Sequence, residues 1–152
     1  MKKMLLVVNP YSGQKKAAKL LPEIIAMFNR ADYTVQVYIT AGPGDATVEA
    51  ARVCRDVDLV VCCGGDGTFN ETLAGILESG LNTPIGYIPA GSTNDFASSL
   101  QISSNTMKAA QTVIDGHPQP VDIGFFCEER TFVYVAAFGA FTEVSYMTPQ
   151  EK

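Results

Sequence analysis

The residues Gly64-Gly65-Asp66-Gly67-Thr68 could bind a phosphate group, and they directly follow the apolar run at residues 58–63. Three glycines within four positions let the backbone approach a ligand and permit φ > 0, so that successive N–H groups can converge on one anion. A carboxylate repels phosphate, so Asp66 fits this loop only if a cation lies between them or if Asp66 handles a proton or a hydroxyl. The loop therefore suggests a metal–nucleotide and phosphoryl transfer, with a structural turn as the alternative.

Two well-known phosphate loops do not match this spacing. A dinucleotide-binding fingerprint would need a glycine at position 70, where the chain has Asn70. A Walker A loop would need Lys followed by Ser or Thr, and no such pair follows Gly67.

A second candidate loop, Asn9-Pro10-Tyr11-Ser12-Gly13, follows the first apolar run of the chain. Pro10 fixes φ, Gly13 permits a tight turn, and Ser12 with the nearby N–H groups can hold a phosphate. Lys15 and Lys16 would add positive charge close by. An ordinary turn between a strand and a helix is the open alternative.

Two further segments carry polar groups after predicted strands. Thr40 could bond a ribose or a phosphate, although a Thr that simply ends a strand is the simpler interpretation. In residues 89–97, Gly91 leaves room for a ligand, Ser92 or Thr93 can cap the next helix, and Thr93 can also reach a phosphate. Asn94 and Asp95, in the same segment, could hold the neighbouring loop or a hydrated cation.

These loops need a scaffold that brings them together, and the hydrophobic pattern predicts one. Short β-type runs alternate with longer segments of helical period, which predicts an α/β fold with a doubly wound parallel sheet. Ligands of such sheets bind at the carboxyl ends of the strands, where every glycine-rich segment of this chain falls. The predicted strands cover residues 4–8, 33–39, 57–62 and 85–88, and the predicted helices cover residues 15–30, 45–55, 68–79, 93–100 and 104–115.

The helix limits have local signals. Pro22 should kink the first helix or mark its restart, and the predicted buried face of this helix contains Ala18, Leu21, Ile25 and Phe28. Asp45, after the turn at residues 42–44, is predicted to cap the second helix.

The pattern changes after residue 120. Residues 121–126 and 130–138 are rich in β-forming residues, are separated by a polar turn, and resemble a hairpin. Because two strands alone are marginally stable, we predict an α/β domain at residues 1–120 and the first strands of a truncated, mostly β domain at residues 121–152.

Composition limits the function classes. The chain has 152 residues, 47% of them hydrophobic and 18% charged, and a net charge of −5 without a basic stripe, which argues against nucleic acid as a partner. No run is long enough for a transmembrane helix, the apolar stretch at residues 4–8 is too short for a signal peptide, and we expect a cytoplasmic protein.

The four cysteines show no CxxC spacing and are expected to be free thiols. The only histidine, His117, lies in a turn, which weakens a Ser-His-Asp hydrolase built on Ser92.

Taken together, the four loops resemble the diacylglycerol kinase catalytic domain, most closely the bacterial soluble lipid kinases. The resemblance rests on Asn-Pro-x-Ser-Gly at 9–13, Thr40 with residues 44–46, Gly-Gly-Asp-Gly-Thr at 64–68 and Pro-x-Gly-Ser-Thr-Asn-Asp-Phe-Ala at 89–97. Residues 138–149 also look like that family's passage into its second domain. The resemblance implies the fold that these enzymes share with NAD kinases and phosphofructokinases, with ATP bound between that domain and a β-sandwich. It also implies transfer of the γ-phosphate to a lipid hydroxyl with Mg²⁺ present.

By position, the resemblance implies which residues form the site. Asp66 would be the acid–base candidate within this chain, while the main base, the main Mg²⁺ site and much of the lipid pocket would lie beyond residue 152. Besides this role, Asp66 would help to order water around Mg²⁺. Asp95 would do the same without contacting the ion directly. The implied ATP-binding residues are Asn9, Pro10, Tyr11, Ser12, Gly13, Thr40, Gly64, Gly65, Asp66, Gly67, Thr68, Phe69, Asn70 and Thr93.

Several alternatives stay open at this stage. An NAD kinase-like enzyme shares the loop at 64–68, although the Ser-Thr-Asn-Asp sequence at 92–95 favours lipid kinases. The chain could also be an inactive nucleotide-binding fragment, and we expect the isolated 152 residues to be inactive. The lipid could be diacylglycerol, a sphingoid base, phosphatidylglycerol or a polyprenol, reached at the inner membrane face. The oligomeric state, including a homodimer, is undetermined.

Overall fold

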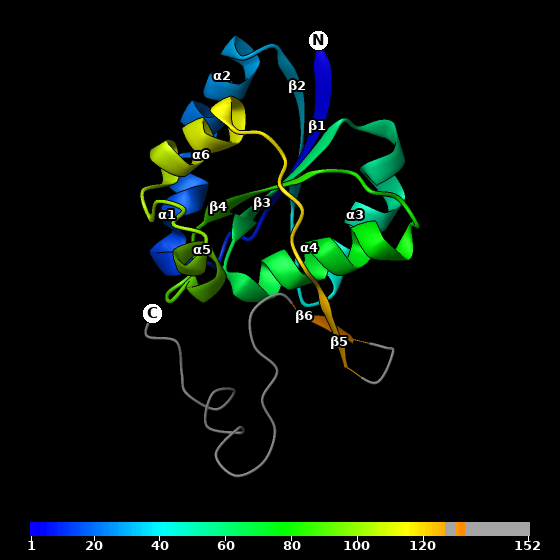
Figure 1. Cartoon of the computed structure of the whole chain (residues 1–152). Helices are drawn as coiled ribbons and strands as arrows, with labels where there is room; N and C mark the ends of the chain where they lie inside the picture. Colours follow the sequence, from blue (N-terminus) through cyan, green and yellow to red (C-terminus); the bar gives the residue numbers. More distant parts are fainter. Residues whose placement is uncertain (127–129, 133–152) are drawn as a thin grey trace.

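A parallel sheet of four strands forms the centre of the chain (Figure 1). The computed structural model describes residues 1–126 and 130–132. The strand order is β2-β1-β3-β4, and the strands are β1 (Lys2–Val8), β2 (Tyr33–Ile39), β3 (Leu59–Gly64) and β4 (Ile85–Pro89). The predicted doubly wound parallel sheet is therefore confirmed.

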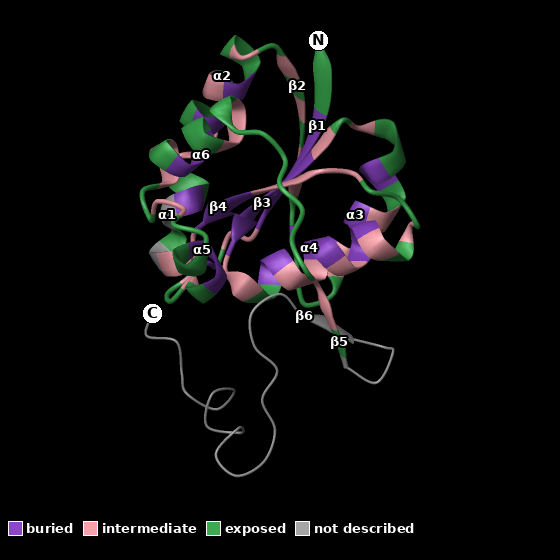
Figure 2. Ribbon diagram, viewed as in Figure 1, coloured by how far each residue is buried: buried purple, intermediate pink, exposed green. Residues whose placement is uncertain are grey.

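Helices cover both faces of this sheet, so the central strands are apolar where the helices cover them, and β1 is buried from Met4 to Val8. On one face α1 (Lys16–Lys19), α2 (Leu21–Arg30) and α6 (Thr106–Asp115) pack on Met4, Leu6 and Val61. On the other face α3 (Asp45–Val53), α4 (Asp66–Glu78) and α5 (Asp95–Ser99) pack on Leu5, Val60 and Cys62. Figure 2 shows the buried residues concentrated in the sheet and on the helix sides that face it.

The first predicted helix is interrupted. A short 3-10 turn, η1 (Gly13–Lys15), leads into α1, and α2 begins at Leu21 with Pro22 in its first turn. Proline has no N–H to continue a helix but suits its first turn, so the restart at Pro22 is confirmed. The break changes the buried face: Ala17, Ile24 and Phe28 are buried, whereas Ala18, which was predicted to be buried, is exposed.

The predicted cap at Asp45 is wrong. Gly44 precedes α3 in the left-handed conformation, with φ of 85°, and Asp45 is already the first helical residue. The Asp45 carboxylate instead accepts hydrogen bonds from the backbone N–H groups of Ala41 and Gly42 at 2.7 and 3.2 Å. Asp45 therefore closes the turn that follows Thr40.

The remaining limits differ from the predictions by a few residues. The segment after α3 continues as a 3-10 turn, η2 (Cys54–Asp56), and α4 starts two residues earlier than predicted, so that Asp66 lies in its first turn. At the start of α6, the Asn105 side chain accepts a hydrogen bond from the Lys108 N–H at 3.0 Å.

The predicted hairpin is present, but its first strand begins at Gly124 and not at residue 121. Strands β5 (Gly124–Phe126) and β6 (Arg130–Phe132) pair antiparallel, and β6 lies against α4. The predicted continuation of the second strand to 138, and the segment 138–149, lie outside the described residues.

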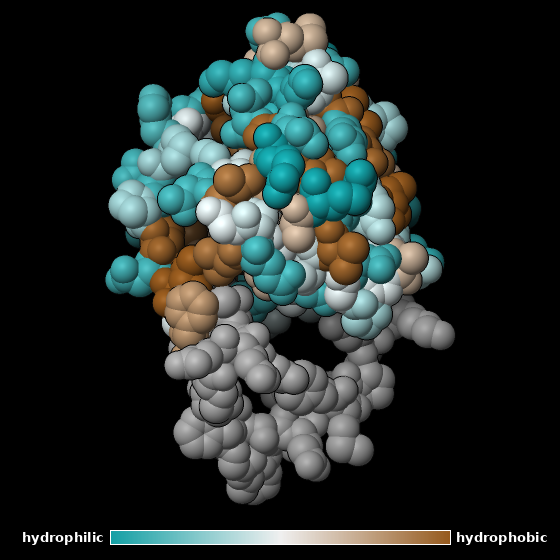
Figure 3. Space-filling model, turned by 90° about the vertical axis from the view of Figure 1, so that its right-hand side faces the viewer, coloured by the Kyte–Doolittle hydropathy of each residue, from teal (hydrophilic) through white to brown (hydrophobic). Residues whose placement is uncertain are grey.

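The surface is mixed in character, and the helices are short. On the face shown in Figure 3, hydrophobic residues form several separate groups between hydrophilic ones. Within residues 1–126 and 130–132, no helix is long and apolar enough to cross a membrane.

Two glycines of α4 predict opposite effects of the same substitution. A Cβ at Gly75 would collide with the Thr47 carbonyl oxygen and lie 2.9 Å from the Ala50 Cβ, where α3 and α4 touch, whereas a Cβ at Gly67 meets nothing within 4 Å. We expect Gly75→Ala to lower the free energy of unfolding by about 1–3 kcal/mol. Gly67→Ala should raise it by about 0.4–1 kcal/mol, because alanine loses less chain entropy on folding. Urea denaturation measures both, and a stabilising Gly75→Ala would contradict the close helix contact.

Candidate active site

The sheet has a topological switch point between β1 and β3, because β1 pairs with β2 on one side and with β3 on the other. The chain leaves β1 toward α1 and α2 on one face of the sheet and leaves β3 toward α4 on the other face. Loops that diverge in this way leave a crevice beyond the strand ends, which is where ligands of such sheets bind. The Asn9 N–H donates to the Cys63 carbonyl oxygen at 3.0 Å and joins the two loops at their origin.

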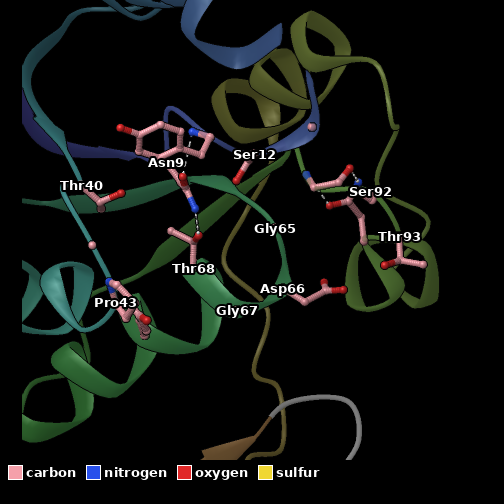
Figure 4. Close-up of a pocket in the computed structure, with 16 residues that line it drawn as sticks. Asn9, Ser12, Thr40, Pro43, Gly65, Asp66, Gly67, Thr68, Ser92 and Thr93 are labelled. Atoms are coloured by element: carbon pink, nitrogen blue, oxygen red, sulfur yellow. Dashed lines mark hydrogen bonds between the residues drawn. The ribbon is translucent and has the colours of Figure 1, made fainter. Parts of the chain in front are cut away.

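A cleft of about 450 Å³ lies at this switch point (Figure 4). It is lined by the loops that follow all four strands of the sheet. Its lining residues are Asn9, Tyr11, Ser12, Gly13, Thr40, Gly42, Pro43, Gly65, Asp66, Gly67, Thr68, Glu71, Gly91, Ser92, Thr93 and Asn94.

Most of the predicted site residues are brought together in this cleft. The predicted residues that do line it are Asn9, Tyr11, Ser12, Gly13, Thr40, Gly65, Asp66, Gly67, Thr68 and Thr93. Pro10, Gly64, Phe69 and Asn70 are not among the lining residues. Gly64 is the last residue of β3, and Phe69 is buried beneath the loop.

A side-chain hydrogen bond in the cleft lining joins the loop after β1 to the start of α4. The Asn9 Nδ2 donates to the Thr68 Oγ1 at 3.0 Å, and the Asn9 Oδ1 accepts from the Tyr11 N–H at 3.0 Å, as the dashed lines in Figure 4 show. Thr68 is buried, and its carbonyl oxygen accepts from the Thr72 hydroxyl one turn further along α4. Asn9 therefore uses both ends of its amide to hold the β1 loop against the start of α4.

The loops pack backbone against backbone. A Cβ at Gly13 would collide with the carbonyl oxygen of Ala90, and a Cβ at Gly91 would lie 2.6 Å from the Gly65 Cα. The Ala90 N–H donates to the Gly64 carbonyl oxygen at 2.8 Å. These glycines therefore let three loops approach one another closely.

Asn94 shapes the fourth loop, and it changes one prediction. Neither Ser92 nor Thr93 caps α5, because Asn94 precedes the helix in the left-handed conformation, with φ of 54°, and no side chain caps it. The Asn94 amide instead bonds both the N–H and the carbonyl oxygen of Gly91, each at 2.8 Å. This closed turn leaves Ser92 and Thr93 exposed at the cleft.

Asp66 is held from the β4 side of the cleft. Its Oδ2 accepts from the Asp95 N–H at 2.9 Å, and its Oδ1 accepts from the Tyr87 hydroxyl at 3.2 Å. Figure 4 shows the Asp66 side chain directed toward Thr93 and away from Thr68. The expectation that the segment at 94–95 braces the neighbouring loop is therefore met by the Asp95 backbone.

An aromatic cluster in the core packs around Tyr87, whose hydroxyl holds Asp66. The Phe69 ring lies 4.6 Å from the Tyr87 ring and 5.1 Å from the Phe96 ring, centroid to centroid, and all three are buried. This packing assigns the Phe69 side chain to the core.

The charges of the cleft are negative. Its charged lining residues are Asp66 and Glu71, and of the described residues that line it none is Lys or Arg. Lys15 is exposed outside the lining. Positive potential comes from the N-terminus of α4, whose first N–H groups have no helical partner. No group of three His, Cys, Asp or Glu side chains that could hold a metal ion occurs in the described part of the chain.

Several lining residues were not in the predicted ATP-binding set. Gly42, Pro43, Gly91, Ser92 and Asn94 belong to segments that were recognised, and their strand-end position was the available signal. The half-buried Glu71 was missed entirely, although it lies four residues after Gly67 on the same side of α4.

Three ionisable groups near the site have raised pKa values. Burial, and then the Asp66 carboxylate, raise the pKa of Tyr87 well above its ordinary range. Burial raises the pKa of Cys63 to about 12, and burial with the neighbouring Cys63 raises the pKa of Cys62 as well. Cys54, Cys62 and Cys63 are free and buried, whereas Cys127 lies outside the described residues.

A parallel sheet whose glycine-rich loops meet at its switch point is the architecture of an α/β domain with its ligand site at the strand ends. Residues 3–126 match the family described as "Diacylglycerol kinase catalytic domain". Because the match covers most of the chain, the chain belongs to the diacylglycerol kinase catalytic domain family, as the four loops predicted.

Named relatives agree with this assignment. The chain is 41% identical over 145 residues to a diacylglycerol kinase of Staphylococcus haemolyticus, covering 95% of this chain and 44% of that protein. It is 40% identical over 151 residues to one of Staphylococcus epidermidis, covering 99% of this chain and 48% of that protein. A crystal structure of a diacylglycerol kinase from Bacillus anthracis superposes with a TM-score of 0.74 at 32% identity, over 80% of this chain and 45% of that chain. The chain thus spans about half the length of the relatives it matches.

The raised pKa values predict loss of stability in alkali. The unfolded state releases the protons of Tyr87, Cys62 and Cys63 at lower pH than the folded state does, so their contribution is complete below about pH 8.5 and is lost as pH rises. The free energy of unfolding should fall by up to about 1.4 kcal/mol per pH unit for each group.

Urea denaturation between pH 8 and 11 measures this fall. Tyr87→Phe should make it shallower above about pH 10, because one group is removed. Phe28→Leu, a buried substitution without an ionisable group, should lower stability equally at every pH. An unchanged slope in Tyr87→Phe would contradict the raised pKa of Tyr87.

Proposed function

We propose that this chain is the nucleotide-binding part of an ATP-dependent lipid kinase that transfers the γ-phosphate of ATP to a lipid hydroxyl such as that of diacylglycerol. The observation that carries the proposal is the meeting of four strand-end loops in one cleft, where the Asn9–Thr68 hydrogen bond joins two of the linking segments. Membership of the diacylglycerol kinase catalytic domain family supports the lipid acceptor.

The nucleotide phosphates would lie against the N-terminus of α4. The backbone N–H groups at Gly65 and Gly67, with the hydroxyls of Ser12 and Thr93, are donors that line the cleft and suit phosphate oxygens. Thr40 would contact the ribose or a phosphate. The predicted contributions of Pro10, Gly64, Phe69 and Asn70 would then be indirect, through the shape of the loops.

The donor set fits Mg²⁺ bound together with the nucleotide. Mg²⁺ is usually held by one or two carboxylates, substrate phosphates and several waters, rather than by a cage of protein ligands. Asp66, with Asp95 behind it, would hold the water shell on the protein side. The bound ion would neutralise charge on the transferring phosphoryl group, which otherwise faces the carboxylates of Asp66 and Glu71.

The chemical step is a displacement at phosphorus. The bond from the γ-phosphorus to the ADP oxygen breaks, a bond from that phosphorus to the lipid oxygen forms, and the hydroxyl proton passes to a base. Asp66 is the acid–base candidate within this chain. We place the main base and the lipid pocket beyond residue 152, so the isolated chain should be inactive.

Further parts of the proposal concern organisation. The α/β domain would end near residue 120 and residues 121–152 would begin a β-sandwich, consistent with the hairpin of β5 and β6. The enzyme would work in the cytoplasm and reach its lipid at the inner membrane face. The full-length protein could form a homodimer, and its oligomeric state is to be measured on that protein.

Phosphate transfer tests the function and the role of Asp66. With [γ-³²P]ATP, Mg²⁺ and mixed micelles of diacylglycerol, the full-length protein should label the lipid, and Asp66→Asn should reduce the rate at least about 100-fold. Asp56→Asn is the matched control and should retain wild-type activity, because Asp56 is exposed and precedes β3 at the end of that strand opposite the cleft.

The acceptor panel decides between enzyme classes. NAD replaces the lipid in one arm, and label in NADP instead of lipid would replace the lipid kinase by an NAD kinase-like enzyme. Label in neither acceptor, nor in sphingosine, phosphatidylglycerol or polyprenol, would favour a binding module. Full activity of Asp66→Asn would remove Asp66 from the mechanism.

A substitution at Gly67 should change nucleotide binding and protein stability in opposite directions. Its added methyl group meets no protein atom but would occupy the cleft that Gly67 lines. Gly67→Ala should therefore weaken Mg·ATP binding by about tenfold while the variant is more stable than wild type. Isothermal titration calorimetry measures the binding, and wild-type affinity would place the phosphates elsewhere.

A further inference from the structure

Tyr87 occupies an unusual position for a polar side chain. It lies on β4 within an apolar cluster with Phe69 and Phe96, is only 4% exposed, and is not among the residues that line the cleft. A buried tyrosine needs a partner for its hydroxyl, because an unpaired polar group is costly in an apolar environment. Its partner is the Oδ1 of Asp66, at 3.2 Å.

This hydrogen bond completes a grip on the Asp66 carboxylate. The Asp95 N–H holds Oδ2 at 2.9 Å, and the Tyr87 hydroxyl holds Oδ1, so each carboxylate oxygen has a donor that belongs to the β4 strand or to α5. A carboxylate oxygen accepts two hydrogen bonds, so one acceptor position on each oxygen remains for water or a ligand at the cleft. Two donors on different oxygens fix the rotation of the carboxylate, which one donor cannot do.

The surroundings keep Tyr87 in the role of donor. The ring is held by Phe69 at 4.6 Å, so the hydroxyl can move little. Burial and the Asp66 carboxylate raise the pKa of Tyr87, so the phenol keeps its proton throughout the neutral range. The hydroxyl therefore donates to Asp66 at every pH at which a kinase would work.

We propose that Tyr87 is a positioning residue for phosphoryl transfer: from beneath the cleft, its hydroxyl orients the Asp66 carboxylate toward the bound nucleotide. This inference rests on the proposed function, because it assigns Tyr87 to the residue on which that function depends. Tyr87 itself touches neither nucleotide nor lipid.

Tyr87→Phe in the full-length protein tests the proposal, since it removes one oxygen atom and keeps the ring in the aromatic cluster. We expect kcat to fall about tenfold, the effect of losing a hydrogen bond to a charged group, while KM for ATP stays within about twofold. Tyr33→Phe, which removes a hydroxyl from a half-buried ring on β2, is the matched control and should keep wild-type kcat.

A second measurement does not depend on catalysis. In the protein without nucleotide, the Asp95 N–H donates a hydrogen bond to the Asp66 carboxylate. Without the Tyr87 hydroxyl the Asp66 side chain should be less firmly held, so the Asp95 amide should be less protected from hydrogen exchange. Hydrogen exchange at Asp95 should be several-fold faster in Tyr87→Phe than in wild type and unchanged in Tyr33→Phe.

The outcomes separate this inference from the proposed function. Wild-type kcat in Tyr87→Phe, with Asp66→Asn inactive, would overturn the role of Tyr87 and leave the kinase intact. Equal losses of activity in Tyr87→Phe and Tyr33→Phe would also overturn it, because the effect would not be specific to this hydroxyl. If the wild type transfers no phosphate, the proposed function fails, and the positioning role of Tyr87 in phosphoryl transfer fails with it. Exchange at Asp95 then decides separately whether Tyr87 holds Asp66.

Discussion

The pairing of β1 with β3 in one parallel sheet is the constraint on which the site depends. Val8 pairs with Cys63 and Gly64 pairs with Pro89, so the chain leaves these strands at nearly the same level. Because the helices that follow β1 and β3 cover opposite faces, the loops diverge and leave a crevice between them. Without this switch point, the four polar loops would be unrelated turns.

Close backbone contact then gives the crevice its shape. Glycines at the contacts between the loops remove side chains that would separate them, and hydrogen bonds of Asn9 and Asn94 hold the resulting turns. The polar groups that remain are mostly backbone N–H groups and hydroxyls. Such groups bind an anion by position and dipole and need no lysine or arginine from the described lining.

The carboxylates of Asp66 and Glu71 give the cleft a negative charge, which groups outside the described lining would have to balance. Asp66 and Glu71 line the cleft, so the nucleotide that we propose to bind there would need a cation to compensate their charge. Hydrogen bonds from Tyr87 and Asp95 also hold both carboxylate oxygens of Asp66, so its side chain is oriented before a ligand binds. Donor binding can thus be organised within this chain, while we assign acceptor binding and proton removal to the rest of the protein.

Periodicity and loop chemistry were enough to predict the parallel sheet, nearly all its helices and most residues of the cleft, because each of these depends on local sequence. The restart at Pro22 and the hairpin after residue 120 were predictable for the same reason. The sequence could not show that Asp45 closes a turn, that Asn94 replaces Ser92 and Thr93 at the start of α5, or that Tyr87 reaches Asp66. The first two depend on left-handed residues at the helix starts, and the last joins residues 21 positions apart. The sequence by itself thus determined which chemical groups stand at the strand ends, whereas the packing of β4 and α5 against α4 decided how they face one another, because side-chain orientation is set by neighbours that are distant along the chain.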